Sequence, residues 1–155
     1  MHSLSTPWLR EIRFFAFGLV PLNFLWEVLQ LPLYTIYSTA TVGQLLFALL
    51  HCTAGDGLIG TGCLVAALLV AATNGWPNAR FAAVALLTIG IGVSFTVYSE
   101  WHNTVVLHSW TYSSTMPTIL KIGLAPLAQW LVIPSILFWR IYCRVSSTEA
   151  RLSGR

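Results

Sequence analysis

Charged residues are scarce in this chain of 155 residues, of which only 8% are Asp, Glu, Lys or Arg. A soluble domain carries about 25% charged residues to keep its surface hydrated. Hydrophobic residues make up 56% of the sequence, and the mean hydropathy is +0.73. The composition therefore predicts a single domain that is embedded almost entirely in a membrane, with membrane lipids as its neighbours.

Motifs that mark several well-known chemistries are also missing. The sequence has no Walker loop, dinucleotide fingerprint, nucleophile elbow or haem motif, which argues against ATP, NAD and serine-nucleophile chemistry. We expect no cofactor. The net charge of +3 is too small to indicate nucleic acid as a partner. Cys52, Cys63 and Cys143 lack C-x-x-C spacing and are interpreted as packing residues, not a disulfide framework.

Four apolar stretches are long enough to cross a bilayer, which takes about 20 helical residues. We expect these helices over residues 14–37, 42–72, 79–99 and 118–139. The first stretch lacks a clear small-residue cleavage site, so we interpret it as a retained helix and not a signal peptide. The predicted fold class is all-α: an integral membrane bundle of four transmembrane helices in one domain, residues 1–145, with a polar tail at 146–155.

The basic residues predict how the bundle is oriented. They precede the first stretch, separate the second from the third, and follow the last: Arg10, Arg13, Arg80, Arg140, Arg144, Arg151 and Arg155. Because Lys and Arg favour cytoplasmic loops, both termini and the tail are expected in the cytoplasm. Lys121 is the single basic residue elsewhere. A multi-pass protein of a bacterial inner membrane is the simplest fit.

Three of the five acidic residues fall within or at the end of the apolar stretches: Glu27, Asp56 and Glu100. A carboxylate in the bilayer interior costs several kcal/mol unless it is paired, protonated or hydrated, so these residues are candidate functional groups. The spacing i, i+4, i+7 places Asn23 and Gln30 on the same helical face as Glu27. The alternative is that these side chains only hydrogen-bond neighbouring helices.

Two further clusters accompany this polar stripe. His51 lies five residues before Asp56, in a segment where both side chains can border one pocket. The end of the third stretch carries Glu100, His102 and Asn103, and the connection at 101–117 is long and rich in aromatic residues. We expect this connection to fold over a pocket as a lid. A hydrated helix end at the interface is the alternative.

The depth of these residues predicts that they meet in one pocket in the outer half of the bundle. The leading hypothesis is acid–base chemistry (isomerisation, cyclisation or hydration) on an apolar, lipid-like substrate. Glu27 and Glu100 are the predicted proton-transfer groups, and His51 and Asp56 a supporting pair. The predicted substrate contacts are Asn23, Gln30, His102, Asn103, Trp110, Tyr112 and Gln129.

The intramembrane carboxylates and histidine are weakly similar to those of small four-helix sterol isomerases. The segment Glu100-Trp-His-Asn103 resembles acidic, Asn-bearing segments of carotenoid cyclases and hydratases. Both similarities are confined to scattered polar residues and assign no family.

Two other classes of function stay open at this point. The chain is equally compatible with a non-catalytic lipid or small-molecule binder, a permeation element that works as a homo-oligomer, or a subunit of a membrane complex. A metal site built from His51, Asp56, Glu100 and His102 has suitable ligand types, but no paired-ligand motif supports it, and we predict no metal.

Overall fold

Four long helices make up most of the chain in the computed structural model, which describes residues 7–73 and 75–153. They are α1 (Pro7–Gln30), α3 (Val42–Ala71), α4 (Phe81–Trp101) and α5 (Leu124–Ser153). The shorter elements are the 3-10 turn η1 (Leu31–Leu33), α2 (Ile36–Thr39), the π-helical turn η2 (His102–Val106), β1 (Thr118–Ile119) and β2 (Ile122–Gly123).

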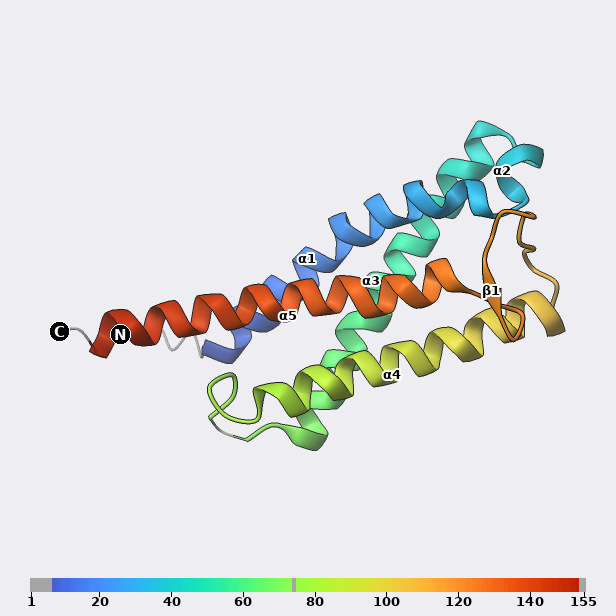
Figure 1. The fold of residues 1–155 in the computed structure, drawn as a ribbon. Helices are drawn as coiled ribbons and strands as arrows, with labels where there is room; N and C mark the ends of the chain where they lie inside the picture. The colour runs from blue at the N-terminus through green and yellow to red at the C-terminus, as the bar shows by residue number, and fades with distance from the viewer. Residues whose placement is uncertain (1–6, 74, 154–155) are drawn as a thin grey trace.

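The long helices pack in a ring, in which α1 and α4 each contact both α3 and α5 (Figure 1). The start of α1, the end of α5 and the α3–α4 connection lie together at what we call the termini end. The hairpin β1–β2, α2 and η2 lie at the opposite, hairpin end. The prediction of an all-α bundle with four long apolar helices is therefore confirmed.

The outer surface of the bundle is apolar, as expected for contact with lipid. Four segments, each built around one long helix, are long and apolar enough to cross a membrane: Trp8–Leu33, Val42–Ala71, Phe81–Val106 and Leu124–Ser147. The first runs on from α1 into η1, and the third from α4 into η2. Large side chains such as Leu58, Leu69 and Leu86 point outward and are 77%, 84% and 71% exposed. A soluble protein rarely exposes so much contiguous apolar surface. The fold is compatible with a multi-pass membrane protein.

The bounds of three helices differ from the predicted ranges by two residues or more. The first helix begins at Pro7, seven residues before the predicted start at 14. The first helix ends at Gln30, seven residues before the predicted limit of 37, because Pro32 lacks an N–H for a helical hydrogen bond. The third continues past residue 99 into η2. The fourth begins at Leu124, since residues 118–123 form the hairpin β1–β2, and it extends to Ser153 through most of the predicted polar tail.

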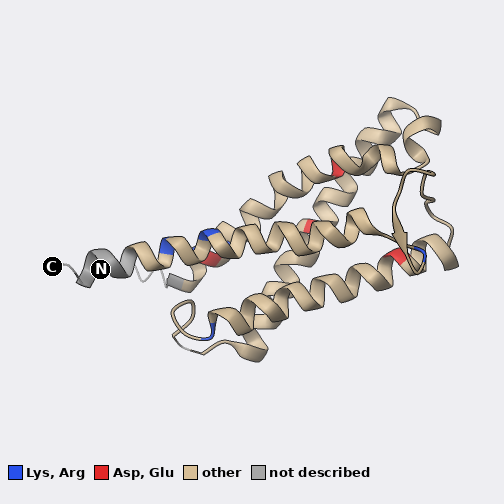
Figure 2. Ribbon diagram, in the orientation of Figure 1, with Lys and Arg blue, Asp and Glu red and all other residues tan. Residues whose placement is uncertain are grey.

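The two halves of the bundle have different interiors. The half nearer the termini end is filled by a cluster of buried apolar side chains that includes Phe15, Leu64, Val84, Leu137 and Ile141. Figure 2 shows that basic residues gather near this end, whereas acidic residues also occur farther along the bundle. Apart from Glu11 and Thr88, the buried polar residues lie in the half nearer the hairpin end.

One acidic residue, Glu11, belongs to the termini end and is fully buried. Its carboxylate lies 2.6 Å from Arg10 Nε and 3.7 Å from Arg144 Nε. This ion cluster joins the start of α1 to α5. Arg144 adds a second contact with α1, since its Cζ lies over the Phe14 ring, 4.4 Å from the ring centroid. No sequence pattern distinguishes Glu11 from the flanking interface residues, so its burial was not predicted.

The connection between α4 and α5 closes the hairpin end by bonding to the connection after α1. Thr35 N–H donates to the Thr111 carbonyl at 3.0 Å, and Ser113 N–H donates to the Leu33 carbonyl at 2.9 Å. Tyr34 and Tyr112 pair as an isolated β-bridge, with their rings 5.5 Å apart. These contacts fix the connection across the end of the bundle.

Candidate functional site

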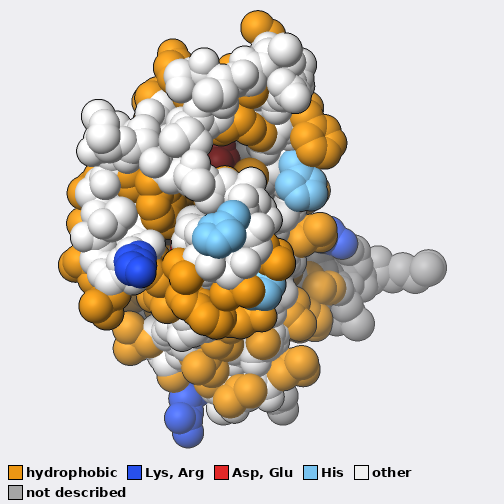
Figure 3. Space-filling view, turned by 90° about the vertical axis from the view of Figure 1, so that its right-hand side faces the viewer, with side chains coloured by type: hydrophobic (Ala, Val, Ile, Leu, Met, Phe, Trp, Pro, Cys, Tyr) orange, Lys and Arg blue, Asp and Glu red, His pale blue; other side chains and the backbone are white. Residues whose placement is uncertain are grey.

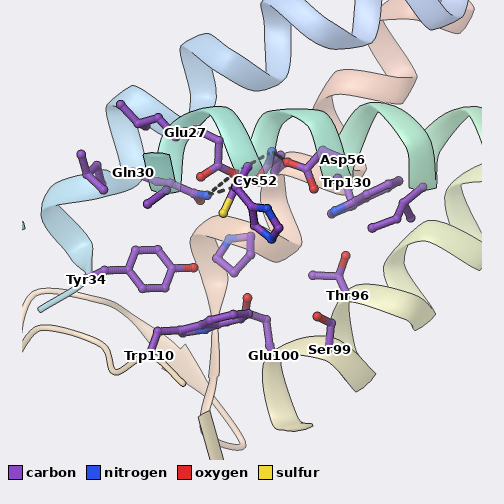
Figure 4. A pocket seen from close by; sticks show the side chains of 18 of the residues that line it. Glu27, Gln30, Tyr34, Cys52, Asp56, Thr96, Ser99, Glu100, Trp110 and Trp130 are labelled. Atoms are coloured by element: carbon purple, nitrogen blue, oxygen red, sulfur yellow. Dashed lines mark hydrogen bonds between the residues drawn. The ribbon is translucent and has the colours of Figure 1, made fainter. Parts of the chain in front are cut away.

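A cavity of about 310 Å³ lies between the helices in the half nearer the hairpin end. Its polar lining includes Glu27 and Gln30 from α1, Asp56 from α3, Ser99 and Glu100 from α4, and Gln129 from α5 (Figure 4). All four long helices therefore contribute. In the space-filling view of the hairpin end, an acidic side chain is visible at the bottom of a hollow (Figure 3).

The polar stripe of α1 faces the interior of the bundle. Asn23, Glu27 and Gln30 are 3%, 9% and 5% exposed, whereas apolar side chains of α1 such as Phe17 and Leu29 point outward. Gln30 Nε2 donates to Glu27 Oε1 at 2.8 Å, and Trp26 Nε1 donates to Gln30 Oε1 at 3.2 Å. The i, i+4, i+7 spacing thus produces one polar face, which is held in place by hydrogen bonds within the helix.

Gln129 joins this stripe to α3. Its amide nitrogen lies 2.8 Å from Asn23 Oδ1, 2.8 Å from Asp56 Oδ2 and 3.3 Å from Glu27 Oε1. Its carbonyl oxygen accepts from Gln30 Nε2 at 3.3 Å. An amide nitrogen has only two hydrogens to share among these three acceptors, so the carboxyl groups of Glu27 and Asp56 compete for one donor. We call these five side chains the Gln129 network.

Glu100 lies on the other side of the cavity and has a separate set of partners. The Tyr112 hydroxyl donates to Glu100 Oε2 and accepts from the Gly123 N–H at 2.9 Å. Burial, and then the neighbouring Glu100, raise the pKa of Tyr112 above its ordinary range, so the phenol keeps its proton and acts as a donor. Trp110 lies beside Glu100 on the same wall (Figure 4).

His51 and Asp56 both line the cavity, as the sequence suggested, but their side chains have different partners. Asp56 is hydrogen-bonded to Gln129, whereas His51 is exposed and stacks on Phe47 with 5.6 Å between ring centroids. Within the described part of the chain, no hydrogen bond joins the two side chains. His51 and the exposed Cys52 lie at the margin of the cavity.

Four of the predicted substrate contacts are not lining residues: Asn23, His102, Asn103 and Tyr112. His102 stacks on Tyr98 with ring centroids 5.5 Å apart, and Asn103 Nδ2 donates to the Ser99 carbonyl at 2.9 Å. Both residues belong to η2, whose π-helical winding departs from the α-helical spacing that would place Asn103 on the face of Glu100. Tyr112 donates instead to Glu100 behind the wall, and Asn23 belongs to the Gln129 network.

Several lining residues were not predicted from the sequence: Tyr34, Cys52, Phe95, Thr96, Ser99 and Trp130. Thr96 lies four residues before Glu100, so the same helical spacing that identified the α1 stripe would have found it. Tyr34 lies four residues after Gln30 and seven after Glu27, so the same spacing within the predicted helix 14–37 would have found it as well. In the structure it lies beyond the end of α1, in the connection held by Tyr112.

The described residues do not form a metal site. Within residues 7–73 and 75–153, no three His, Cys, Asp or Glu side chains lie close enough together to hold one ion. The four residues suggested as ligands are separated, since His102 lies outside the cavity and Asp56 bonds to an amide.

No protein-family model, curated protein or solved structure matches this chain. The cavity and its side chains are therefore the basis for any functional inference.

Proposed function

We propose that the chain is a multi-pass membrane enzyme that binds an apolar, lipid-like molecule in this cavity and moves protons to and from its carbon atoms. One observation supports this proposal most strongly. Carboxyl groups line two sides of a largely apolar cavity. Glu27 and Asp56 lie on one side within the Gln129 network, and Glu100 lies on the other side, bonded to Tyr112. The two sides thus differ in their hydrogen-bond partners.

Such an arrangement suits double-bond isomerisation. In that reaction a carboxylic acid adds its proton to one carbon atom of the double bond, which leaves a carbocation. A carboxylate then removes a proton from a neighbouring carbon atom, and the double bond re-forms at the shifted position. No electron acceptor is required, and the net composition of the substrate is unchanged. Two carboxyl groups whose surroundings differ can hold the opposite protonation states that the reaction needs.

We assign the proton transfers to Glu27 and Glu100. Asp56 supports Glu27 by sharing the Gln129 donor, and Tyr112 supports Glu100 by donating to it. The aromatic faces of Trp110 and Trp130 line the same cavity and would stabilise positive charge that develops on the substrate. Cyclisation and hydration need the same groups, with a different fate for the cationic intermediate.

We further propose that the termini end faces the cytoplasm and that the cavity opens toward the opposite side of a bacterial inner membrane. The support is the charge distribution, since Arg10, Arg80, Arg140 and Arg144 gather near the termini end (Figure 2). The substrate would then reach the cavity from the outer leaflet or from the outer aqueous phase.

Deuterium incorporation tests the proposed chemistry even when the substrate has not been identified. The purified protein is incubated in D₂O with a total lipid extract of the membranes that contain it, and lipids are analysed by mass spectrometry. We expect one lipid species to gain carbon-bound deuterium with the wild-type protein. The gain should disappear with Glu100→Gln and Glu27→Gln, which keep an oxygen acceptor for their hydrogen-bond donors. No deuterium gain with any protein would contradict the enzyme.

Non-catalytic binding is the alternative, and the Gln129 network favours it. Its side chains satisfy one another by hydrogen bonds, as a purely structural or binding element would. A small molecule that copurifies with the protein but gains no deuterium would select this alternative. Loss of assembly in the variants would instead point to a subunit of a larger complex or homo-oligomer.

A further inference from the structure

We infer that the ligand of this cavity carries one organic cation, such as a quaternary or protonated amine, on an apolar body. This inference rests on the proposed function in one respect, since both require a ligand in the cavity. It adds the chemical class of the group that the polar side chains recognise.

The first argument is the charge of the cavity lining. Glu27, Asp56 and Glu100 line it, and neither Lys nor Arg occurs among the described lining residues. The buried Glu11, by contrast, lies beside Arg10 and Arg144. Carboxylates that are buried without a positive partner are strongly disfavoured. A cationic ligand would supply the positive charge that the chain itself supplies at Glu11.

The second argument is the aromatic lining. Tyr34, Phe95, Trp110 and Trp130 come from four different elements or connections and border the same cavity as the three acids. The faces of aromatic rings attract cations, and quaternary ammonium groups are commonly recognised in this way. The combination of acids with aromatic faces is suited to an amine and is poorly suited to an anionic headgroup.

The third argument is a buried hydroxyl group that lacks a partner. Thr96 is only 5% exposed, and its hydroxyl oxygen has no hydrogen-bond partner among the described residues. Thr96 lines the cavity, and its hydroxyl points into it (Figure 4). Buried polar atoms in proteins are normally satisfied. A polar ligand group at this position would satisfy the hydroxyl, because it can accept from an ammonium N–H.

An inorganic cation does not fit these observations as well. No three acidic, His or Cys side chains among the described residues converge on a point that could hold a metal ion. The acids instead border a cavity of about 310 Å³. A space of that size falls within the range of small-molecule sites, and an amine with a short alkyl chain would fill it.

Cys52 provides a native reporter for the test, because it is exposed and lines the cavity. The protein in lipid nanodiscs is alkylated with N-ethylmaleimide, and peptides are quantified by mass spectrometry over time. The probes are protonated N,N-dimethyloctylamine, which has an ammonium N–H, and 2-methyldecane, which has the same shape without the charge. Cys143 is also exposed and lies on α5 outside the cavity, so it reports any general effect of the probes.

We expect the ammonium probe to slow Cys52 alkylation about tenfold at a concentration ten times its Kd, with no effect on Cys143. The neutral probe should have little effect. Asp56→Asn and Glu100→Gln should each weaken the protection of Cys52. The control is Glu149→Gln, which also removes one negative charge but lies twenty residues after Gln129 on α5, and it should leave the protection unchanged. Thermal unfolding of each variant shows whether it is folded.

Equal protection by both probes, or protection by neither, would overturn the inference. Deuterium incorporation into a neutral lipid would still support the proposed enzyme in either case. Conversely, selective protection by the ammonium probe without any deuterium incorporation would support the cationic ligand and contradict the enzyme. The two proposals can therefore fail separately.

Discussion

The Tyr112 hydroxyl donates a hydrogen bond to the Glu100 carboxylate while it accepts one from the Gly123 N–H at 2.9 Å. Tyr112 belongs to the connection that closes the hairpin end, and Glu100 belongs to α4. This single phenol therefore links the closing segment to the cavity. Gly123 is suited to the contact, since a methyl group there would lie 3.1 Å from the Tyr112 ring.

The first prediction concerns Tyr112→Phe and pH. Burial and Glu100 raise the pKa of Tyr112 above its ordinary value of 10.0. The folded protein thus retains a proton that the unfolded chain loses, so the stability from this group is complete below pH 10 and falls as the pH rises further. We expect the thermal unfolding midpoint to fall less steeply above pH 10 in Tyr112→Phe than in the wild type. Identical slopes would contradict this account of the phenol.

The second prediction concerns the Gln129 network. Interhelical hydrogen bonds in membrane proteins contribute about 0.6 kcal/mol each. Gln129→Leu removes the bonds to Asn23, Glu27, Gln30 and Asp56, so we expect a loss of about 2 kcal/mol in the free energy of unfolding. Ser135→Ala is the matched control on α5, because the Ser135 hydroxyl bonds only to the Leu131 carbonyl of its own helix. Similar losses in both variants would argue against the network.

The third prediction tests the close approach of α4 and α5. A methyl group on Gly92 would lie 2.7 Å from Trp130 Cζ3, whereas a methyl group on Gly90 would meet nothing within 4 Å. We expect Gly92→Ala to destabilise the protein by about 1–3 kcal/mol through overpacking, and to reduce ligand binding because Trp130 lines the cavity. Gly90→Ala should be neutral or slightly stabilising. Thermal unfolding of both variants decides the point.

The fourth prediction concerns orientation. Two reporter enzymes are fused in turn after Arg155, one that is active only in the cytoplasm and one that is active only outside it. If the basic residues face the cytoplasm, only the first fusion should be active. A cysteine introduced at Leu120, which is 92% exposed at the hairpin end, should react with a membrane-impermeant thiol reagent added outside intact cells. The opposite pattern in both assays would reverse the proposed direction in which the cavity opens.

Local spacing was sufficient to predict part of this structure. The four apolar stretches predicted the long helices, and the i, i+4, i+7 pattern predicted that Asn23, Glu27 and Gln30 share a face. Both features arise within one helix, where the geometry of the α-helix fixes which side chains lie together. The predicted range of 14–37 ran past Pro32, whose missing N–H ends α1 at Gln30.

Contacts between distant segments could not be predicted in the same way. Gln129 lies 106 residues from its partner Asn23, and 73 residues from Asp56. Its central place depends on which helices are neighbours, and the sequence leaves that arrangement open. The place of His102 and Asn103 outside the cavity lining depends on η2, where the helix continues with a different hydrogen-bond pattern.

Native mass spectrometry of the gently solubilised protein, beside its Glu100→Gln variant, tests most directly whether the cavity is a ligand site. We predict that the wild-type protein retains a bound small molecule with an apolar body, and that the variant retains much less of it at equal thermal stability. A fully empty wild-type protein, folded as well as the variant, would contradict the central claim and would direct attention to partner subunits.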